Sequence, residues 1–299
     1  SRQTDIAVYP TAASGVSEVE RTVRDALAGD PKDPHAQLAE FLLQRSTLDF
    51  MATENRLRGI LAGAPANIHA MRHLWDFLVC VGRCQEALSL AERSVATAPL
   101  AAGNQFPRAQ LLWIVGRTAE SDRVIERAAR LWPSHRWIRF ARFTILAFSG
   151  RARVAQGMLD SGNAPQNFSQ ANIELWRKSL PALYDPSPAN IAIARKANSE
   201  GAATDLELAS QAVMVLSALG DVDATFKVID ALYATSASSG KPGKSRGTSI
   251  AWRFAPWLFT PPVAAMRADQ RFNALCDSIG LTDYWAKRGI KPDYQLNVA

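Results

Sequence analysis

A chain of 299 residues that is 47% hydrophobic can bury a large core, so the sequence excludes an intrinsically disordered protein. The uncharged and largely apolar run of residues 208–220 has 13 residues, whereas a spanning helix needs roughly 18, so we predict no membrane span. The net charge is +6, and the window 117–153, with nine arginines and three acidic residues, carries the same excess. Such a field attracts acidic partners, although a solvated arginine-rich face is the simpler explanation.

The sequence leaves the cellular compartment open. It begins at Ser1 rather than Met, which suggests a fragment or a processed product with further sequence upstream. Three cysteines do not make a disulfide framework, and Cys80 and Cys84 are best explained as small core residues. Two compartments stay open: the cytoplasm, or the periplasm if the full-length protein has an upstream membrane helix.

The first predicted helix opens at a capping box, Ser17-Glu18-Val19-Glu20, and ends near Ala28, before Gly29-Asp30-Pro31. The next unit, residues 34–65, has Thr53 as a small helix-contact residue and Pro65 as its stop. It carries Leu48 where later units have a turn glycine, so we predict a looser turn in this unit.

A step of 34 residues runs through the next part of the chain. Prolines and glycines both keep it, at Pro31, Pro65, Pro99 and Pro133, and at Gly82, Gly116 and Gly150. Each glycine separates two amphipathic runs, where a tight interhelical turn needs a positive φ. Prolines end the second helices because they cannot continue the hydrogen-bond ladder. Five residues after each glycine comes a small side chain that lets the two helices approach: Ala87, Ser121 and Ala155.

The turn glycine, the small residue and the terminal proline together resemble the tetratricopeptide repeat, most clearly over residues 66–165. The usual tryptophan and glycine of the first helix are absent, and Trp75 and Phe143 fill that region differently, so the repeats are divergent. The resemblance implies an all-α, right-handed superhelix of antiparallel helix pairs that binds proteins or peptides. We assign residues 1–235 to these repeats, clearest in 34–165 and degraded in 166–235.

Downstream the pattern weakens but continues. Gly220 lies 70 residues after Gly150, about two repeat lengths, and is followed by the small residue Thr225. A capping box of Thr204 and Glu207 is expected to open the helix before Gly220. Residues 168–183 and 187–198 form a predicted helix pair without a turn glycine, bent or broken by Pro181, Pro186 and Pro188. We predict helices throughout and no strand.

Residues 236–250, SASSGKPGKSRGTSI, are small, polar and basic, which predicts a flexible surface loop. Gly243-Lys244-Ser245 resembles the end of a phosphate-binding loop. However, Ser238 stands where the first glycine of that motif belongs, and a predicted helix precedes it in place of a strand. We therefore predict no nucleotide site and no cofactor.

The C-terminal segment, residues 251–299, is rich in Trp and Phe and is predicted to form helices that cap the open end of the superhelix. It is also similar to the C-terminal end of tetratricopeptide regions in bacterial signalling proteins, although Gln270 replaces the usual proline. The residues that carry this similarity are Arg267, Asp269, Arg271-Phe272, Leu275, Gly280-Leu281, Tyr284-Trp285, Gly289 and Pro292-Asp293.

Such regions commonly follow a winged-helix DNA-binding domain, as in CadC-type transcriptional regulators. The similarity implies the sensory or interaction region of a bacterial regulator that acts in signalling. No part of this sequence has the pattern of the winged helix itself, so direct nucleic-acid binding by this chain is not expected.

No motif for catalysis or metal binding stands out. His69 and His73 lie four residues apart on one predicted helix, a spacing that suits a metal ion. Cys80 is seven residues further, roughly 10 Å along the axis, and no nearby carboxylate completes a ligand set. No nucleophile elbow and no glycine-rich loop after a strand is present. We predict a protein that is not an enzyme and binds no metal.

The candidate binding residues are surface arginines. Arg136, Arg139 and Arg142 stand at i, i+3 and i+6 on the first helix of the third clear repeat. The resemblance implies that the first helices of the repeats line a concave groove. Arginine forks there would bind the carboxylates of an acidic partner. The competing interpretation is that these arginines pair with Glu120 or Glu126, or face water. The aromatic residues of the same helix are expected in the core: Trp137, Phe140 and Phe143.

Our functional prediction is a non-catalytic module that binds a protein or peptide in its groove. The alternative is a small-ligand sensor whose pocket lies between the superhelix and the C-terminal cap, near Trp252, Trp257 or Trp285. An enzyme active site in the same crevice is the third and weakest hypothesis.

Overall fold

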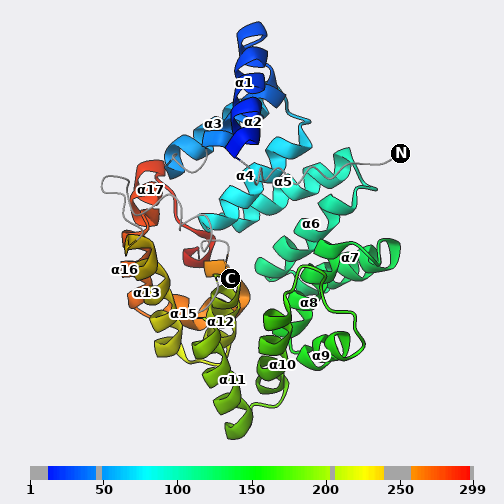
Figure 1. Cartoon of the computed structure of the whole chain (residues 1–299), viewed down its shortest axis with the longest axis vertical. Coiled ribbons are helices and arrows are strands. Elements are labelled where there is room, and N and C mark those ends of the chain that lie inside the picture. Colours follow the sequence, from blue (N-terminus) through cyan, green and yellow to red (C-terminus); the bar gives the residue numbers. More distant parts are fainter. Residues whose placement is uncertain (1–12, 45–48, 203–205, 239–256, 297–299) are drawn as a thin grey trace.

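The computed structural model of the chain describes residues 13–44, 49–202, 206–238 and 257–296 (Figure 1). Sixteen α-helices and two 3-10 turns make up most of this part, and no strand occurs within it. The all-helical class predicted from the sequence is therefore confirmed. Helices that follow one another in the chain pack against one another, pair after pair.

The helices of the repeat region are α1 (Ala13–Gly29), α2 (Pro34–Gln44), α3 (Phe50–Gly63), α4 (Ile68–Cys80), α5 (Cys84–Thr97), α6 (Ala102–Ile114), α7 (Thr118–Leu131), α8 (Arg136–Phe148), α9 (Ala152–Asp160), α10 (Gln170–Tyr184), α11 (Pro188–Gly201), α12 (Leu206–Ala218) and α13 (Val222–Ser238). The C-terminal segment adds the 3-10 turn η1 (Pro261–Val263), α15 (Ala264–Ala268), α16 (Arg271–Ser278), α17 (Leu281–Arg288) and η2 (Asp293–Gln295).

The predicted turn glycines adopt the left-handed conformation. The φ angles are 74° at Gly82, 83° at Gly116, 72° at Gly150 and 73° at Gly220. After α4, the N–H of Arg83 donates to the carbonyl of Leu78 at 2.8 Å, which satisfies a carbonyl that the helix end leaves free. This geometry reverses the chain within three residues and brings α5 back along α4.

The predicted prolines follow the ends of the second helices at a constant distance. The helices α1, α3, α5 and α7 each end two residues before their proline, at Gly29, Gly63, Thr97 and Leu131. The helix α9 differs, because it ends at Asp160, five residues before Pro165. There Gly162, with a φ of 72°, ends the helix before the proline is reached.

The small residue five positions after each turn lies at a helix contact, as predicted. Thr53, Ala87, Ser121, Ala155 and Thr225 are all 0% exposed. The hydroxyl of Ser121 in α7 donates to the carbonyl of Ala109 in α6 at 2.7 Å, so the two helices touch at this position. A larger side chain would force the helices of each pair apart.

Three details differ from the predictions. The helix α1 begins at Ala13, so Ser17 lies within it and does not cap its start. Pro181 lies inside α10, which continues through it to Tyr184 and is not broken. The helix α13 runs to Ser238, so the predicted loop loses its first three residues to a helix. Thr204 and the rest of the loop, including Gly243-Lys244-Ser245, lie outside the described residues.

The C-terminal segment packs against both early and late helices of the array. The turn η1 and α15 lie on α12. The helix α17 lies beside α3 (Figure 1). A single hydrophobic core therefore joins side chains of α3, α4 and α5 to side chains of α12, α13 and α15–α17. The chain closes on itself through contacts between residues more than 200 positions apart.

Candidate functional site

The structure separates the three candidate arginines of α8 by their contacts. Arg142 donates from Nε to the Glu126 carboxylate in α7 at 2.8 Å, as the competing interpretation held. Arg139 donates to the backbone carbonyl of Pro133 at 2.7 Å. The exposed Arg136 guanidinium lies 5.5 Å from the centre of the Trp137 ring. Within the described part of the chain, Arg136 and Arg139 form no ion pair, so both charges remain available to a partner.

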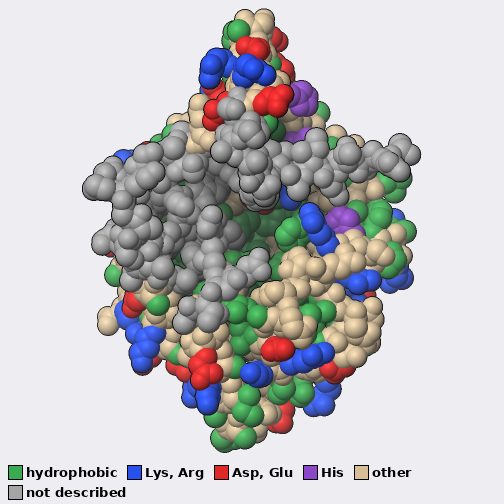
Figure 2. All heavy atoms as spheres, viewed as in Figure 1, with side chains coloured by type: hydrophobic (Ala, Val, Ile, Leu, Met, Phe, Trp, Pro, Cys, Tyr) green, Lys and Arg blue, Asp and Glu red, His purple; other side chains and the backbone are tan. Residues whose placement is uncertain are grey.

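A row of aromatic side chains runs beside these two arginines. Phe106 stacks on Trp137 with ring centres 6.1 Å apart, and Trp137 meets Phe140 edge to face at 5.9 Å. Phe140 then contacts Phe168 at 5.9 Å and Trp257 at 6.4 Å. Figure 2 shows hydrophobic side chains in a hollow near the centre of one face of the molecule, with a basic side chain beside them.

The aromatic residues of α8 divide between core and surface. Phe143 is 0% exposed and belongs to the core, as predicted. Trp137 and Phe140 are only partly buried, so part of each ring remains accessible. We define the α8 surface as Arg136, Trp137, Arg139 and Phe140, together with Phe168 and Trp257, which contact Phe140. It alternates basic and aromatic positions along one helix.

The candidate pocket tryptophans have different surroundings. Trp257 is partly buried and lies against Phe140. Trp285 is 7% exposed, and its indole N–H donates to the carbonyl of Val81 at 2.9 Å, so it holds α17 on the turn after α4. Trp252 lies outside the described residues.

A cluster of charges joins α17 to the first repeats. Glu54 of α3 has a side chain that is only 1% exposed. Its Oε1 accepts hydrogen bonds from Arg58 Nε at 2.8 Å and from Arg83 Nη1 at 2.6 Å. Its Oε2 accepts from the Tyr284 hydroxyl at 2.9 Å and lies 2.7 Å from Arg288 Nε. One buried carboxylate therefore connects residues of α3, of the turn after α4 and of α17.

The ionisation of this cluster follows from its contacts. Burial alone would raise the pKa of Glu54, but hydrogen bonds from Arg58 and Tyr284 and the charges of Arg83 and Arg58 outweigh it, so its pKa is lowered. Burial, together with the neighbouring Glu54 carboxylate, raises the pKa of Tyr284 to about 12. Glu54 is therefore ionised and Tyr284 neutral at pH 7, which suits a structural connection rather than proton transfer.

The sequence carries a periodic signal for these contacts. An arginine follows the turn glycine in three successive units, at Arg83, Arg117 and Arg151. Arg83 pairs with Glu54, and Arg151 pairs with Asp122, in both cases 29 residues earlier in the chain. Arg117 has Leu88 at the equivalent place and pairs with Glu120 at 2.6 Å instead. The Gly-Arg step and the acidic residue 29 positions before it together predict an ion pair between adjacent units.

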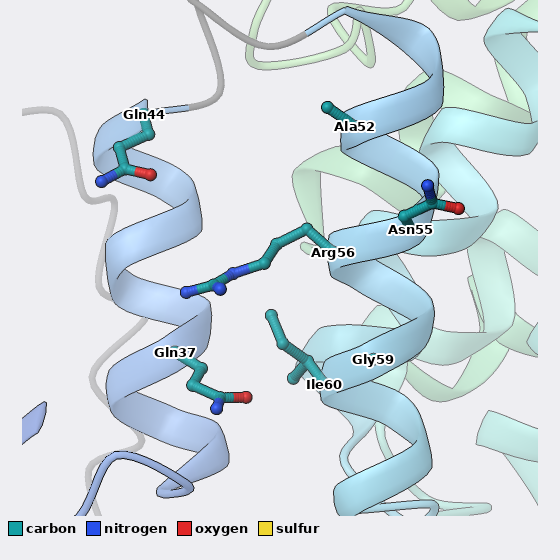
Figure 3. Close-up of a pocket in the computed structure, with 7 residues that line it drawn as sticks. All are labelled: Gln37, Gln44, Ala52, Asn55, Arg56, Gly59 and Ile60. Atoms are coloured by element: carbon teal, nitrogen blue, oxygen red, sulfur yellow. The ribbon is translucent and has the colours of Figure 1, made fainter.

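Five residues join α2 to α3, whereas three join α4 to α5. Positions 45–48, where a looser turn is predicted, lie outside the described residues. A cleft of about 540 Å³ lies between α2 and α3. Arg56 reaches across it from α3 toward α2 and pairs with Glu40 (Figure 3). The cleft is lined by Gln37, Gln44, Ala52, Asn55, Arg56, Gly59 and Ile60.

The described residues contain no group of three or more His, Cys, Asp or Glu side chains that could hold a metal ion. His69 is exposed, and the His73 ring lies 6.3 Å from that of Phe41. The cysteines are free and buried, and burial raises the pKa of Cys84 and of Cys276 to about 12. Over the described ranges, every helix is too short or too polar to cross a membrane.

Comparison with known proteins gave no family for the chain. No protein-family model matches the sequence, and no curated protein matches it significantly.

Proposed function

We propose that the chain is a non-catalytic, tetratricopeptide-like superhelix that binds a protein or peptide segment on the α8 surface. The observation that carries this proposal is the row of partly buried aromatic rings beside Arg136 and Arg139, two arginines that form no ion pair with any residue that the structure describes. Aromatic and arginine side chains dominate the binding energy of protein interfaces. A rigid helix presents both kinds here at neighbouring positions.

The chemistry of the α8 surface defines the segment that it would accept. Trp137 and Phe140 offer apolar faces for an aromatic or aliphatic side chain. Arg136 and Arg139 offer guanidinium groups for carboxylates, which they bind with paired hydrogen bonds. The preferred partner is therefore an acidic segment that also carries an apolar anchor.

The wider role that we propose is that of the sensory or interaction region of a bacterial transcriptional regulator. The similarity of the C-terminal segment to tetratricopeptide regions that follow winged-helix domains supports this context. Recognition of a partner would then change the state of a DNA-binding domain outside this sequence.

Selection from a random peptide library on the immobilised protein tests the proposal. We expect enriched peptides with acidic and apolar residues, whose affinity falls at least tenfold in the double variant Arg136→Ala/Arg139→Ala. The matched control is Arg177→Ala/Lys178→Ala, which removes two exposed charges from α10. Selection of no peptide, or an equal loss of affinity in the control, contradicts the proposal.

A further inference from the structure

We infer that the outer face of α7 is a docking surface for an acidic, amphipathic protein segment. The inference is independent of the α8 surface and concerns a different set of arginines. The helix α7 contains three acidic residues. Each of them is already paired with an arginine outside the body of this helix: Glu120 with Arg117 at 2.6 Å, Asp122 with Arg151 at 2.7 Å, and Glu126 with Arg142 at 2.8 Å.

The remaining charges of α7 are all positive and lie on one face. Arg123, Arg127 and Arg130 stand at i, i+4 and i+7, so their directions fall within about 60° of one another and span about 10 Å along the axis. All three are exposed. Among the residues that the structure describes, none of the three forms a salt bridge or a hydrogen bond with another side chain. We call these three residues the α7 stripe.

Within the described part of the chain, the α7 stripe contributes little to the fold. The charge of Arg123 helps to lower the pKa of Glu120, but less than the hydrogen bond from Arg117, and Arg130 lies in the last turn, where the helix dipole mildly favours a positive charge. Like charges three and four residues apart on a helix repel one another and lower its stability. The carboxylates that would relieve this repulsion are held by Arg117, Arg142 and Arg151. An anionic partner would place negative charges beside the three arginines and remove their mutual repulsion. The α7 helix would therefore be more stable when a partner is bound than when it is free.

The residue at the end of the stripe indicates a protein partner. Leu131 is 53% exposed and follows Arg130 at the end of α7. An exposed leucine beside arginines offers an apolar contact. An acidic amphipathic protein segment can use this contact, whereas the phosphate backbone of a nucleic acid cannot. The helix lies at the outer edge of the array, away from the C-terminal segment, so the stripe is open to a partner (Figure 1).

The test measures binding of a synthetic acidic helix to the full chain. The probe is a peptide of about four helical turns, with glutamates spaced as the arginines are and one leucine beyond the last of them. We expect the triple variant Arg123→Gln/Arg127→Gln/Arg130→Gln to lose at least tenfold in affinity. Its thermal midpoint should be unchanged or higher, because the repulsion within α7 is removed.

Two controls test whether the affinity depends on the α7 stripe itself, on the overall positive charge of the protein or on the α8 surface. The variant Arg177→Gln/Lys178→Gln/Lys196→Gln removes the same charge from exposed positions of α10 and α11 and should keep the affinity. The probe is also measured in the background of the double variant Arg136→Ala/Arg139→Ala, which removes the charges of the α8 surface. The α7 substitutions should cost at least tenfold in affinity in this background too, which leaves this inference testable if the proposed function fails. The inference is overturned if the α10–α11 variant loses as much affinity, if the peptide does not bind, or if duplex DNA binds the stripe more tightly than the peptide at equal salt.

Discussion

The close contact between Gly82 and the C-terminal segment can be measured with one added methyl group. Gly82 and Gly116 have nearly the same conformation, with φ angles of 74° and 83°. A Cβ at Gly82 would lie 2.9 Å from Phe259 Cε1 and 2.9 Å from Pro292 Cβ, whereas a Cβ at Gly116 would meet no atom within 4 Å. The pair Gly82→Ala and Gly116→Ala therefore differs mainly in packing.

The expected losses of stability follow from these two environments. An alanine forced into the left-handed conformation costs about 1–2 kcal/mol, and this applies to both variants. Overpacking costs typically about 1–3 kcal/mol more, and it applies to Gly82 alone. Pro292 cannot withdraw easily, because the N–H of Asp293 donates to the carbonyl of Gly82 at 2.8 Å. We expect losses of about 2–5 kcal/mol for Gly82→Ala and about 1–2 kcal/mol for Gly116→Ala.

Denaturant unfolding followed by circular dichroism gives both free energies. Hydrogen exchange adds a local measurement: the amides of α17 should exchange faster in Gly82→Ala than in Gly116→Ala, because the first substitution pushes the C-terminal segment away. Equal losses of stability, together with unchanged exchange in α17, would falsify the close packing of this segment on the turn.

Three further predictions concern the charge cluster, the α2–α3 cleft and the cysteines. Glu54→Gln should lower the free energy of unfolding by about 1–3 kcal/mol, because three partly exposed arginines lose a charged hydrogen-bond acceptor. Folding lowers the pKa of Glu54, so the stabilisation by its carboxylate is complete above the unfolded pKa of 4.5 and is lost as the pH falls through the folded pKa. The stability of Glu54→Gln should therefore depend less on pH in the acid range. An unchanged acid transition contradicts this. Gly59→Ala should stabilise the protein by about 1 kcal/mol, because the glycine lies inside α3 and a Cβ there meets no atom within 4 Å. Calorimetry measures this change. A loss of stability would show that the cleft is closed at Gly59. The buried cysteines should react with a thiol reagent only after unfolding, and rapid labelling of the native protein at any of them would contradict their burial.

The part of the fold that the sequence predicted depends on local rules. A positive φ at Gly82 or Gly116 follows from the residue type and from its place between two amphipathic runs. The helix ends before Pro65 and Pro99 follow from the covalent structure of proline. Ser17 was misplaced because a capping box is a short pattern that also occurs inside helices, and α1 had already begun at Ala13.

The candidate site was predicted less well, because the partner of a charge depends on tertiary contacts. The sequence pointed to a basic window, but it did not separate Arg142, which pairs with Glu126, from Arg136, which pairs with no carboxylate of the described residues. Trp137 packs against the hydrophobic core, as expected, but the sequence did not predict that it stays partly exposed. The ion pair between Arg151 and Asp122 was within reach, since both residues keep a regular spacing.

The sequence by itself determined the period, the turns and the succession of helix pairs, because these depend on contacts within one unit or between adjacent units. The tertiary structure alone decided that the C-terminal segment returns to the first repeats. Tyr284 donates to Glu54 across 230 positions of the chain. No periodic pattern encodes a contact of that separation, because it depends on how the small rotations of all the intervening helix pairs add up.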